Sequence, residues 1–123
     1  MTDIIYLSGP ITDNPDFYDD FRIAEEIVHT RFASAVVVNP ARTSEGISCL
    51  DGYAPYEVYM MMDIAMLDHC TAIVMLPGYE TSAGAVQELA YATIHGLKIY
   101  KMEEDYGIEE LKCRNDSALH ELS

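Results

Sequence analysis

Basic residues are scarce in this sequence. It has 7 lysine and arginine residues against 21 aspartate and glutamate residues, a formal net charge of −14 at pH 7. Such a chain repels the phosphate backbone of nucleic acids and anionic membrane surfaces, so we expect neither as a partner. A small anionic ligand is still compatible with this charge, because backbone N–H groups at a helix N-terminus can hold a phosphate with few cationic side chains.

Cysteines and long apolar runs are also few. The three cysteines, Cys49, Cys70 and Cys113, are odd in number and have no C-x-x-C spacing. This usage favours free thiols in a reducing compartment and predicts a cytoplasmic protein. The longest apolar runs, such as AIVML at 72–76, are too short to span a bilayer, and the N-terminus lacks the basic and apolar segments of an export signal.

Several catalytic and cofactor-binding motifs are missing. The sequence contains neither G-x-G-x-x-G nor a Walker-type phosphate loop, which argues against dinucleotide binding and NTP hydrolysis. It has no G-x-S-x-G elbow for a Ser/His/Asp triad. The 4 histidines show no metal-ligand spacing. We therefore expect no metal and no cofactor.

The sequence does contain the material of one packed domain. With 123 residues, half of them apolar, the chain can bury roughly two-thirds of the surface that its unfolded form exposes. We find no linkers or repeats and expect a single domain over residues 1–123.

Short apolar runs alternate with segments of helical periodicity. The runs predict strands, and the repeats at three- and four-residue steps predict helices. Because each strand is a continuous apolar run, we expect a parallel sheet of four to five strands with helices on both faces, a three-layer α/β sandwich. The predicted strands are 3–7, 35–38, 71–76 and 97–102, the predicted helices are 16–32, 56–69, 82–95 and a short one at 108–113, and 41–54 is a predicted loop.

The carboxyl ends of the predicted strands are candidate ligand sites. In open parallel sheets, ligands bind beyond these ends, where the strand order changes direction. The corresponding positions are Ser8-Gly9-Pro10, Asn39-Pro40-Ala41-Arg42 and the segment from Pro77 to Gly84.

The helix predicted at 82–95 carries a possible anion site and an unusual carboxylate. If Ser82 caps this helix, Gly84 lies in the first turn, where backbone N–H groups are unpaired and the dipole is positive. A simple cap with Gly84 as a packing residue is the more economical interpretation of this feature alone. Glu88 shares the helix face of Gly84 and small neighbours, where a ligand could approach it, although a solvated glutamate explains its position equally well.

Two further residues could act together with Glu88. Asp63 interrupts the apolar stretch MMMDIAML, and two carboxylates from neighbouring helices could converge on one crevice for acid–base or nucleophilic chemistry on a sugar. Tyr6, near the end of the first strand, could donate its hydroxyl to a nearby carboxylate. Taken singly, a surface aspartate and a packed tyrosine are the simpler interpretations.

Four blocks in order resemble one known superfamily. They are IYLSGPI at 5–11, VVNP at 37–40, DIAMLDHCTAIVMLPGYETSAGAVQE at 63–88 and AYATIHGLKIY at 90–100. Together they resemble the nucleoside 2-deoxyribosyltransferase-like superfamily, and they look closest to its small, often phage-encoded branch. The resemblance implies a flavodoxin- or Rossmann-like fold, a nucleoside or nucleotide substrate and a homodimer or higher homo-oligomer.

The resemblance also implies roles for individual residues. Glu88 matches the family's nucleophile, Tyr6 the tyrosine that orients it, and Asp63 an aspartate that protonates the departing base or binds the sugar. Ser82 and Gly84 match the phosphate cradle of members that act on nucleoside 5'-monophosphates. The first loop lacks the basic residue of those members, so we expect Arg42 to replace it, with Ser8, Gly9, Pro10 and Asn39 as further substrate-binding residues.

Three functions follow from these expectations. The first is an N-glycosidase that hydrolyses a (deoxy)nucleoside 5'-monophosphate through a covalent glycosyl-Glu88 intermediate. The second is a 2-deoxyribosyltransferase that exchanges bases on deoxynucleosides. The third is a nucleotide-binding or sensing module that has lost turnover.

Overall fold

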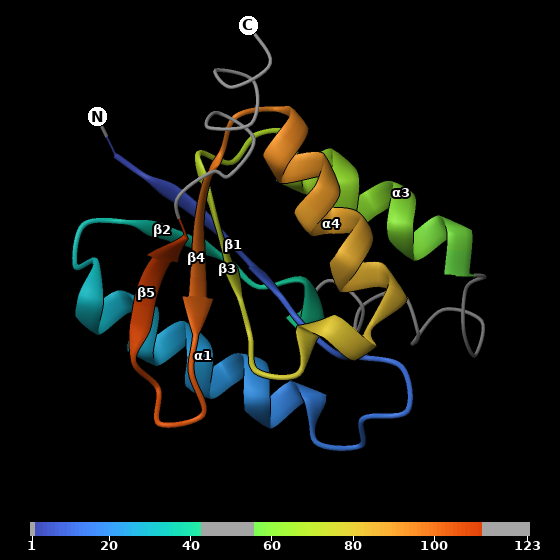
Figure 1. Ribbon diagram of the computed structural model, residues 1–123, viewed down its shortest axis with the longest axis horizontal. Helices are drawn as coiled ribbons and strands as arrows, with labels where there is room; N and C mark the ends of the chain where they lie inside the picture. The colour runs from blue at the N-terminus through green and yellow to red at the C-terminus, as the bar shows by residue number, and fades with distance from the viewer. Residues whose placement is uncertain (1, 43–55, 112–123) are drawn as a thin grey trace, which may run out of the picture.

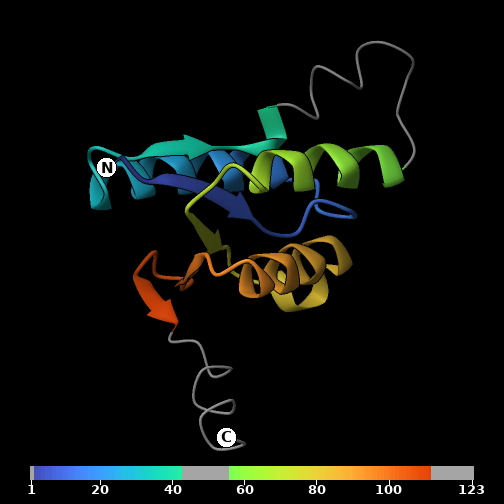
Figure 2. The same ribbon diagram turned by 90° about the horizontal axis from the view of Figure 1, so that it is seen from above.

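The protein folds as an α/β domain around a five-stranded sheet. The computed structural model describes residues 2–42 and 56–111. Its strands are β1 (Ile4–Ser8), β2 (Val36–Val38), β3 (Ala72–Met75), β4 (Lys98–Met102) and β5 (Ile108–Leu111). They lie in the order β2-β1-β3-β4-β5, and Figure 2 shows β2 and β5 at opposite edges of the sheet. The first four strands are parallel, whereas β5 runs antiparallel to β4.

Helices cover both faces of the sheet. The helix α1 (Phe17–Arg31) lies on one face, and α3 (Tyr56–Leu67) and α4 (Ala83–Ile94) lie together on the other (Figure 1). A short 3-10 helix, η1 (Tyr79–Thr81), precedes α4. This arrangement confirms the predicted α/β sandwich, with one antiparallel edge strand added to the parallel sheet.

The two faces of the sheet hold separate hydrophobic cores. Successive side chains of a strand point to opposite faces, so Ile5 and Leu7 of β1 pack with the α1 core, while Tyr6 packs on the side of α3 and α4. Because both faces are covered, β3 is buried along its whole length. This burial explains why the strands appear in the sequence as continuous apolar runs.

The strands and long helices agree closely with the predicted ranges. The helix α4 ends at its C-cap His95, and Gly96 follows with a φ of +75°, the left-handed conformation that favours glycine after a helix. Cys70 is a buried free thiol, whereas Cys49 and Cys113 lie outside the described residues. The loop predicted at 41–54 also falls almost wholly outside them, and its first two residues, Ala41 and Arg42, are helical.

The helix predicted at 108–113 is wrong, because residues 108–111 form β5. A helix would place Ile108 and Leu111 on one face, three residues apart, whereas a strand places them on opposite faces. Ile108 packs with the α1 core and Leu111 with the core beneath α3 and α4. The pairing of Met102 with Ile108 and of Ile99 with Leu111 therefore fills both cores at the sheet edge.

None of the helices within residues 2–42 and 56–111 combines the length and the apolar character needed to cross a bilayer.

Candidate functional site

A cleft of about 810 Å³ opens at the carboxyl ends of β1 and β3. These two neighbouring strands mark the point where the strand order changes direction, because β1 leads to α1 on one face and β3 leads to α4 on the other. Ligands of open α/β sheets bind at such a point. The cleft is lined by Gly9, Pro10, Ile11, Thr12, Asp13, Phe17, Tyr18, Tyr59, Met60, Asp63, Thr81, Ser82, Ala83, Gly84, Ala85 and Glu88.

Glu88 forms the base of this cleft. It lies in the middle of α4, and only 5% of its surface is exposed. Two hydroxyl groups donate hydrogen bonds to its carboxyl group: Tyr6 Oη to Oε2 at 2.7 Å and Ser8 Oγ to Oε1 at 2.6 Å. The interpretation of Glu88 as a solvated helix residue is therefore excluded, and each of its oxygens has a defined partner.

Asp63 meets Glu88 from the neighbouring helix. It lies on α3 with 8% of its surface exposed, and it is close enough to Glu88 for each carboxyl group to affect the pKa of the other. The sequence predicted this convergence of two carboxylates, and the packing of α3 against α4 produces it.

The environment favours the protonated forms of both carboxyl groups. Burial raises the pKa of Glu88 to about 8; the bonds from Ser8 and Tyr6 oppose this rise, and the charge of Asp63 adds to it. Burial also raises the pKa of Asp63 to about 6. Because two adjacent buried carboxylates repel each other, the pair holds one proton between them near neutral pH.

Tyr6 serves as a permanent hydrogen-bond donor to this pair. The residue is fully buried, and burial together with the charges of Glu88 and Asp63 moves its pKa far above the ordinary tyrosine range. Its phenol therefore stays protonated at any physiological pH. The predicted bond from Tyr6 to Glu88 is present.

The N-terminus of α4 forms another wall of the cleft. Ser82 is the N-cap, and its hydroxyl oxygen accepts a hydrogen bond from the Ala85 N–H at 3.2 Å. The N–H groups of Ala83 and Gly84 have no partner among the described residues, and both residues line the cleft. Ser82 is thus a true helix cap beside two donors that can bind a ligand oxygen.

Gly9 and Pro10 line the cleft where the chain leaves β1. A Cβ atom at Gly9 would lie 2.8 Å from Leu76 Cβ, closer than real Cβ atoms approach one another. Glycine is therefore required for the close approach of the segments that follow β1 and β3, both of which contribute residues to the cleft lining.

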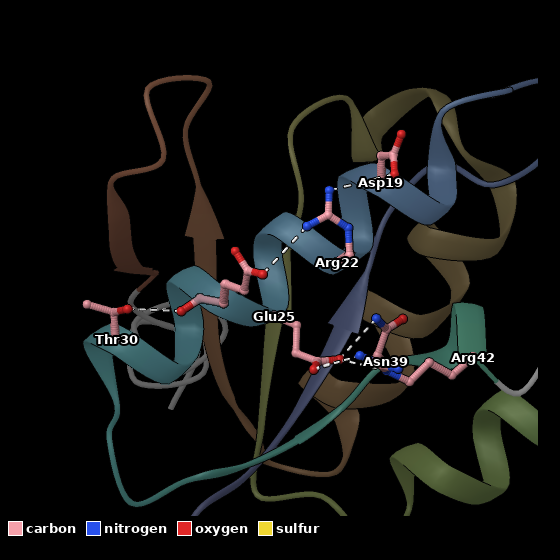
Figure 3. Close-up of polar contacts among 7 residues, drawn as sticks. Asp19, Arg22, Glu25, Thr30, Asn39 and Arg42 are labelled. Atoms are coloured by element: carbon pink, nitrogen blue, oxygen red, sulfur yellow. Dashed lines mark hydrogen bonds and ion pairs between the residues drawn. The ribbon is translucent and has the colours of Figure 1, made fainter.

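Asn39 and Arg42 do not contribute to the cleft lining. Both contact Glu25 on α1: Asn39 Nδ2 donates to Oε1 at 3.2 Å, and Arg42 donates from Nε and Nη2 to the two carboxylate oxygens at 3.1 Å each (Figure 3). The arginine holds the pKa of Glu25 below its usual range. In this structure the pair fastens the segment after β2 to α1, and the expected contact of Arg42 with a substrate phosphate stays a prediction.

Ser8 also lies elsewhere than expected. Its side chain is fully buried and contacts Glu88 from behind, and it is not among the lining residues. The predicted contact between Ser8 and a substrate is thus replaced by a contact with the candidate nucleophile.

Sequence reasoning missed the aromatic wall of the cleft. Phe17, Tyr18 and Tyr59 line the cleft together with Met60. One signal was available, because Tyr59 precedes Asp63 by four residues and so shares its helix face. Phe17 and Tyr18 gave no such signal, since only the path of 9–16 brings the start of α1 to the cleft.

Residues 2–42 and 56–111 contain no group of three or more His, Cys, Asp or Glu side chains that could hold a metal ion.

The sheet and the cleft together define a Rossmann-like α/β domain with a carboxyl pair at its switch point. The chain belongs to the DUF4406 family, a domain of unknown function, whose model matches residues 3–101. The structure is similar to the crystal structure of a conserved protein from Enterococcus faecalis V583, with a TM-score of 0.66, 19% identity, and coverage of 99% of this chain and 75% of that chain. This similarity shows the fold alone. No curated protein matches the sequence.

Proposed function

We propose that this protein is an N-glycosidase that cleaves the base–sugar bond of a (deoxy)nucleoside 5'-monophosphate, with Glu88 as nucleophile. The observation that carries the proposal is the Glu88 carboxyl group at the base of the cleft, bonded to Tyr6 and Ser8 and paired with Asp63. The resemblance of the sequence to the nucleoside 2-deoxyribosyltransferase-like superfamily supports the same assignment.

The carboxyl pair suits a double displacement. Glu88 Oε attacks the anomeric carbon, the bond from that carbon to the base nitrogen breaks, and Asp63 gives its proton to the departing base. Water then attacks the anomeric carbon of the glycosyl-enzyme, Asp63 takes the water proton, and Glu88 leaves as a carboxylate. The pair carries one proton before the first step and one after the second, so the cycle is balanced.

The walls of the cleft suit the parts of a nucleotide. The side chains of Phe17, Tyr18 and Tyr59 offer aromatic surface on which a base can stack. The unpaired N–H groups of Ala83 and Gly84 offer donors for the 5'-phosphate at the positive end of α4. The phosphate would then lie at one end of the cleft and the anomeric carbon near Glu88.

A second candidate is a 2-deoxyribosyltransferase that acts on unphosphorylated deoxynucleosides. The observation that favours it is the charge of the cleft: Asp13, Asp63 and Glu88 line it, and no lysine or arginine of the described residues does. Both candidates share the glycosyl-Glu88 intermediate and differ in the substrate and in the acceptor that resolves it.

We test the proposal by incubating the protein with nucleosides and their 5'-monophosphates and measuring released base by chromatography. We expect release from the monophosphates, and a fall of at least about 1000-fold for Glu88→Gln, because the nucleophile is lost. Asp63→Asn should lose about 100-fold or more, since it cannot protonate the base. Glu80→Gln, at an exposed glutamate of η1, is the matched control and should retain full activity.

The remaining outcomes separate the alternatives. Formation of a new nucleoside on addition of a second base supports the transferase. Binding of a nucleotide in calorimetry without release of base from any substrate contradicts both enzymes and favours a nucleotide-binding module. Detection of a glycosyl adduct on the peptide that contains Glu88 by mass spectrometry supports the shared first step.

A further inference from the structure

The hydroxyl of Ser8 is directed entirely at Glu88. Ser8 has no exposed surface, and its Oγ donates a hydrogen bond to Glu88 Oε1 at 2.6 Å. This is the shorter of the two hydroxyl bonds to the Glu88 carboxyl group. The residue does not line the cleft, so a ligand there cannot reach its hydroxyl. Any contribution of Ser8 to chemistry must therefore pass through Glu88.

The sheet holds this hydroxyl in a fixed position. Ser8 is the last residue of β1, in register with Met75 of β3, and its carbonyl oxygen accepts a bond from the Leu76 N–H at 2.7 Å. Tyr6 lies two residues earlier and so projects from the same face of the strand. One strand thus supplies a donor to each oxygen of the same carboxyl group.

The surroundings of the two carboxyl groups differ. Glu88 faces Tyr6 and Ser8 from β1 and Asp63 from α3, and the thiol of Cys70 lies near Tyr6. The strands β3 and β4 add apolar side chains such as Ile73, Met75 and Ile99 to this face. Among the described residues, no hydroxyl, amide or cationic group donates to Asp63. Donors stabilise the charged form of a carboxyl group, so Tyr6 and Ser8 oppose the effect of burial at Glu88.

We propose that Ser8 is a positioning residue that favours the ionised form of Glu88 and, with it, the arrangement in which the shared proton lies on Asp63. This inference rests on the proposed function, in which Glu88 must attack as a carboxylate while Asp63 must hold a proton. Loss of the Ser8 hydroxyl moves the proton toward Glu88, and the nucleophile and the acid are then both in the wrong state. One hydrogen bond therefore sets two catalytic roles.

The test measures the ionisation of Glu88 directly, without substrate. The chain is labelled with 13C at the glutamate side-chain carboxyl carbon, the Glu88 signal is identified by its loss in Glu88→Gln, and the signal is followed from pH 4 to pH 10 by NMR. Ser8→Ala should raise the midpoint of this titration by about one pH unit, because it removes a donor to the charged form. Thr93→Ala, which removes a hydroxyl elsewhere on α4 that bonds to Leu89 O, should leave the midpoint unchanged.

Two further variants and an activity measurement complete the test. Ser8→Cys keeps the shape with a weaker donor and should shift the midpoint in the same direction by less, so it replaces Ser8→Ala if that variant does not fold. Ser8→Thr retains the hydroxyl and should restore the wild-type midpoint. In base release, the acid limb of the kcat profile should move up by about one pH unit in Ser8→Ala, with KM changed less than about twofold.

An unchanged Glu88 midpoint in folded Ser8→Ala or Ser8→Cys would overturn the proposal. The two proposals fail separately. A shifted midpoint in a protein that releases no base would remove the proposed function and leave the Ser8–Glu88 coupling intact. Base release together with an unshifted midpoint would support the proposed function and contradict the Ser8–Glu88 coupling.

Discussion

Glu88 and Asp63 place two carboxyl groups where water is largely excluded. Each is less than a tenth exposed, burial raises the pKa of both, and the charge of Asp63 raises that of Glu88 further. Burial of an ionised carboxyl group costs free energy, which the hydroxyls of Tyr6 and Ser8 offset only in part. Such an arrangement is unfavourable for folding at high pH, which indicates that it is retained for a use other than stability.

This cost predicts a pH dependence of stability. Glu88 has a pKa near 4.5 in the unfolded chain and about 8 in the folded protein, so between these values the folded state binds more protons than the unfolded state. The free energy of unfolding should therefore fall as the pH rises from about 4.5 to about 8, by roughly 2 to 4 kcal/mol. Urea denaturation at several pH values measures this fall.

Glu88→Gln should remove most of this dependence, because its amide does not titrate. Glu80→Gln, at an exposed position, should retain it. An equally steep loss of stability in Glu88→Gln would assign the effect to other groups.

The helix α4 combines a structural and a candidate binding role at its first turn. Ser82 caps the helix through the Ala85 N–H, while Ala83 and Gly84, whose N–H groups have no partner among the described residues, line the cleft. The side chains of Ala85 and Ala92 are small enough for α4 to pack on β3 and β4 and to bring Glu88 over β1. The cap, the two donors and the proposed nucleophile thus lie on one helix.

Substitutions of Ser82 separate the cap from the proposed phosphate contact. Ser82→Ala should lose about 1 kcal/mol of stability, because the Ala85 N–H loses its acceptor. Ser82→Asp keeps an acceptor at the cap and should stay within about 0.5 kcal/mol of wild type. Its new charge should nevertheless raise KM for a 5'-monophosphate about tenfold, with KM for the matching nucleoside nearly unchanged. Equal turnover of the monophosphate by Ser82→Asp and wild type would place the phosphate away from this turn.

The molecule as a whole carries a strong negative field. Its net charge is −14, and the described arginines and lysines lie away from the cleft, for example Arg22 beside Asp19 and Glu26, Arg42 on Glu25, and Lys101 beside Glu103. A phosphate that enters the cleft must therefore overcome repulsion, which the helix N-terminus offsets only over a short range.

This field predicts an unusual salt dependence. Raising the ionic strength from about 0.01 M to about 0.15 M shortens the screening length from about 30 Å to about 8 Å. KM for a nucleoside 5'-monophosphate should then fall severalfold, because long-range repulsion is screened, while KM for a nucleoside should not change. Steady-state kinetics at the two salt concentrations provide the measurement. A KM for the monophosphate that rises with salt would contradict net repulsion and indicate a cationic group at the site.

The resemblance also implied a homo-oligomer, and the composition implied a cytoplasmic protein. Both stay predictions.

The fold and much of the site followed from local patterns. Apolar runs and helical repeats predicted four strands and three long helices, and the order of strand ends and helix starts predicted the cleft. Periodicity made the convergence of Tyr6, Asp63 and Glu88 possible, and the resemblance to the nucleoside 2-deoxyribosyltransferase-like superfamily implied it.

Other features depended on contacts between distant parts of the chain. The sequence by itself determined the alternating elements, the acidic charge and the candidates Glu88, Asp63 and Tyr6, since these depend on spacing within a segment. Only the tertiary structure decided that Ser8 lies behind Glu88, 80 residues away, that Asn39 and Arg42 contact Glu25, and that 108–111 is a strand. These outcomes depend on register and packing between elements, which no local pattern encodes.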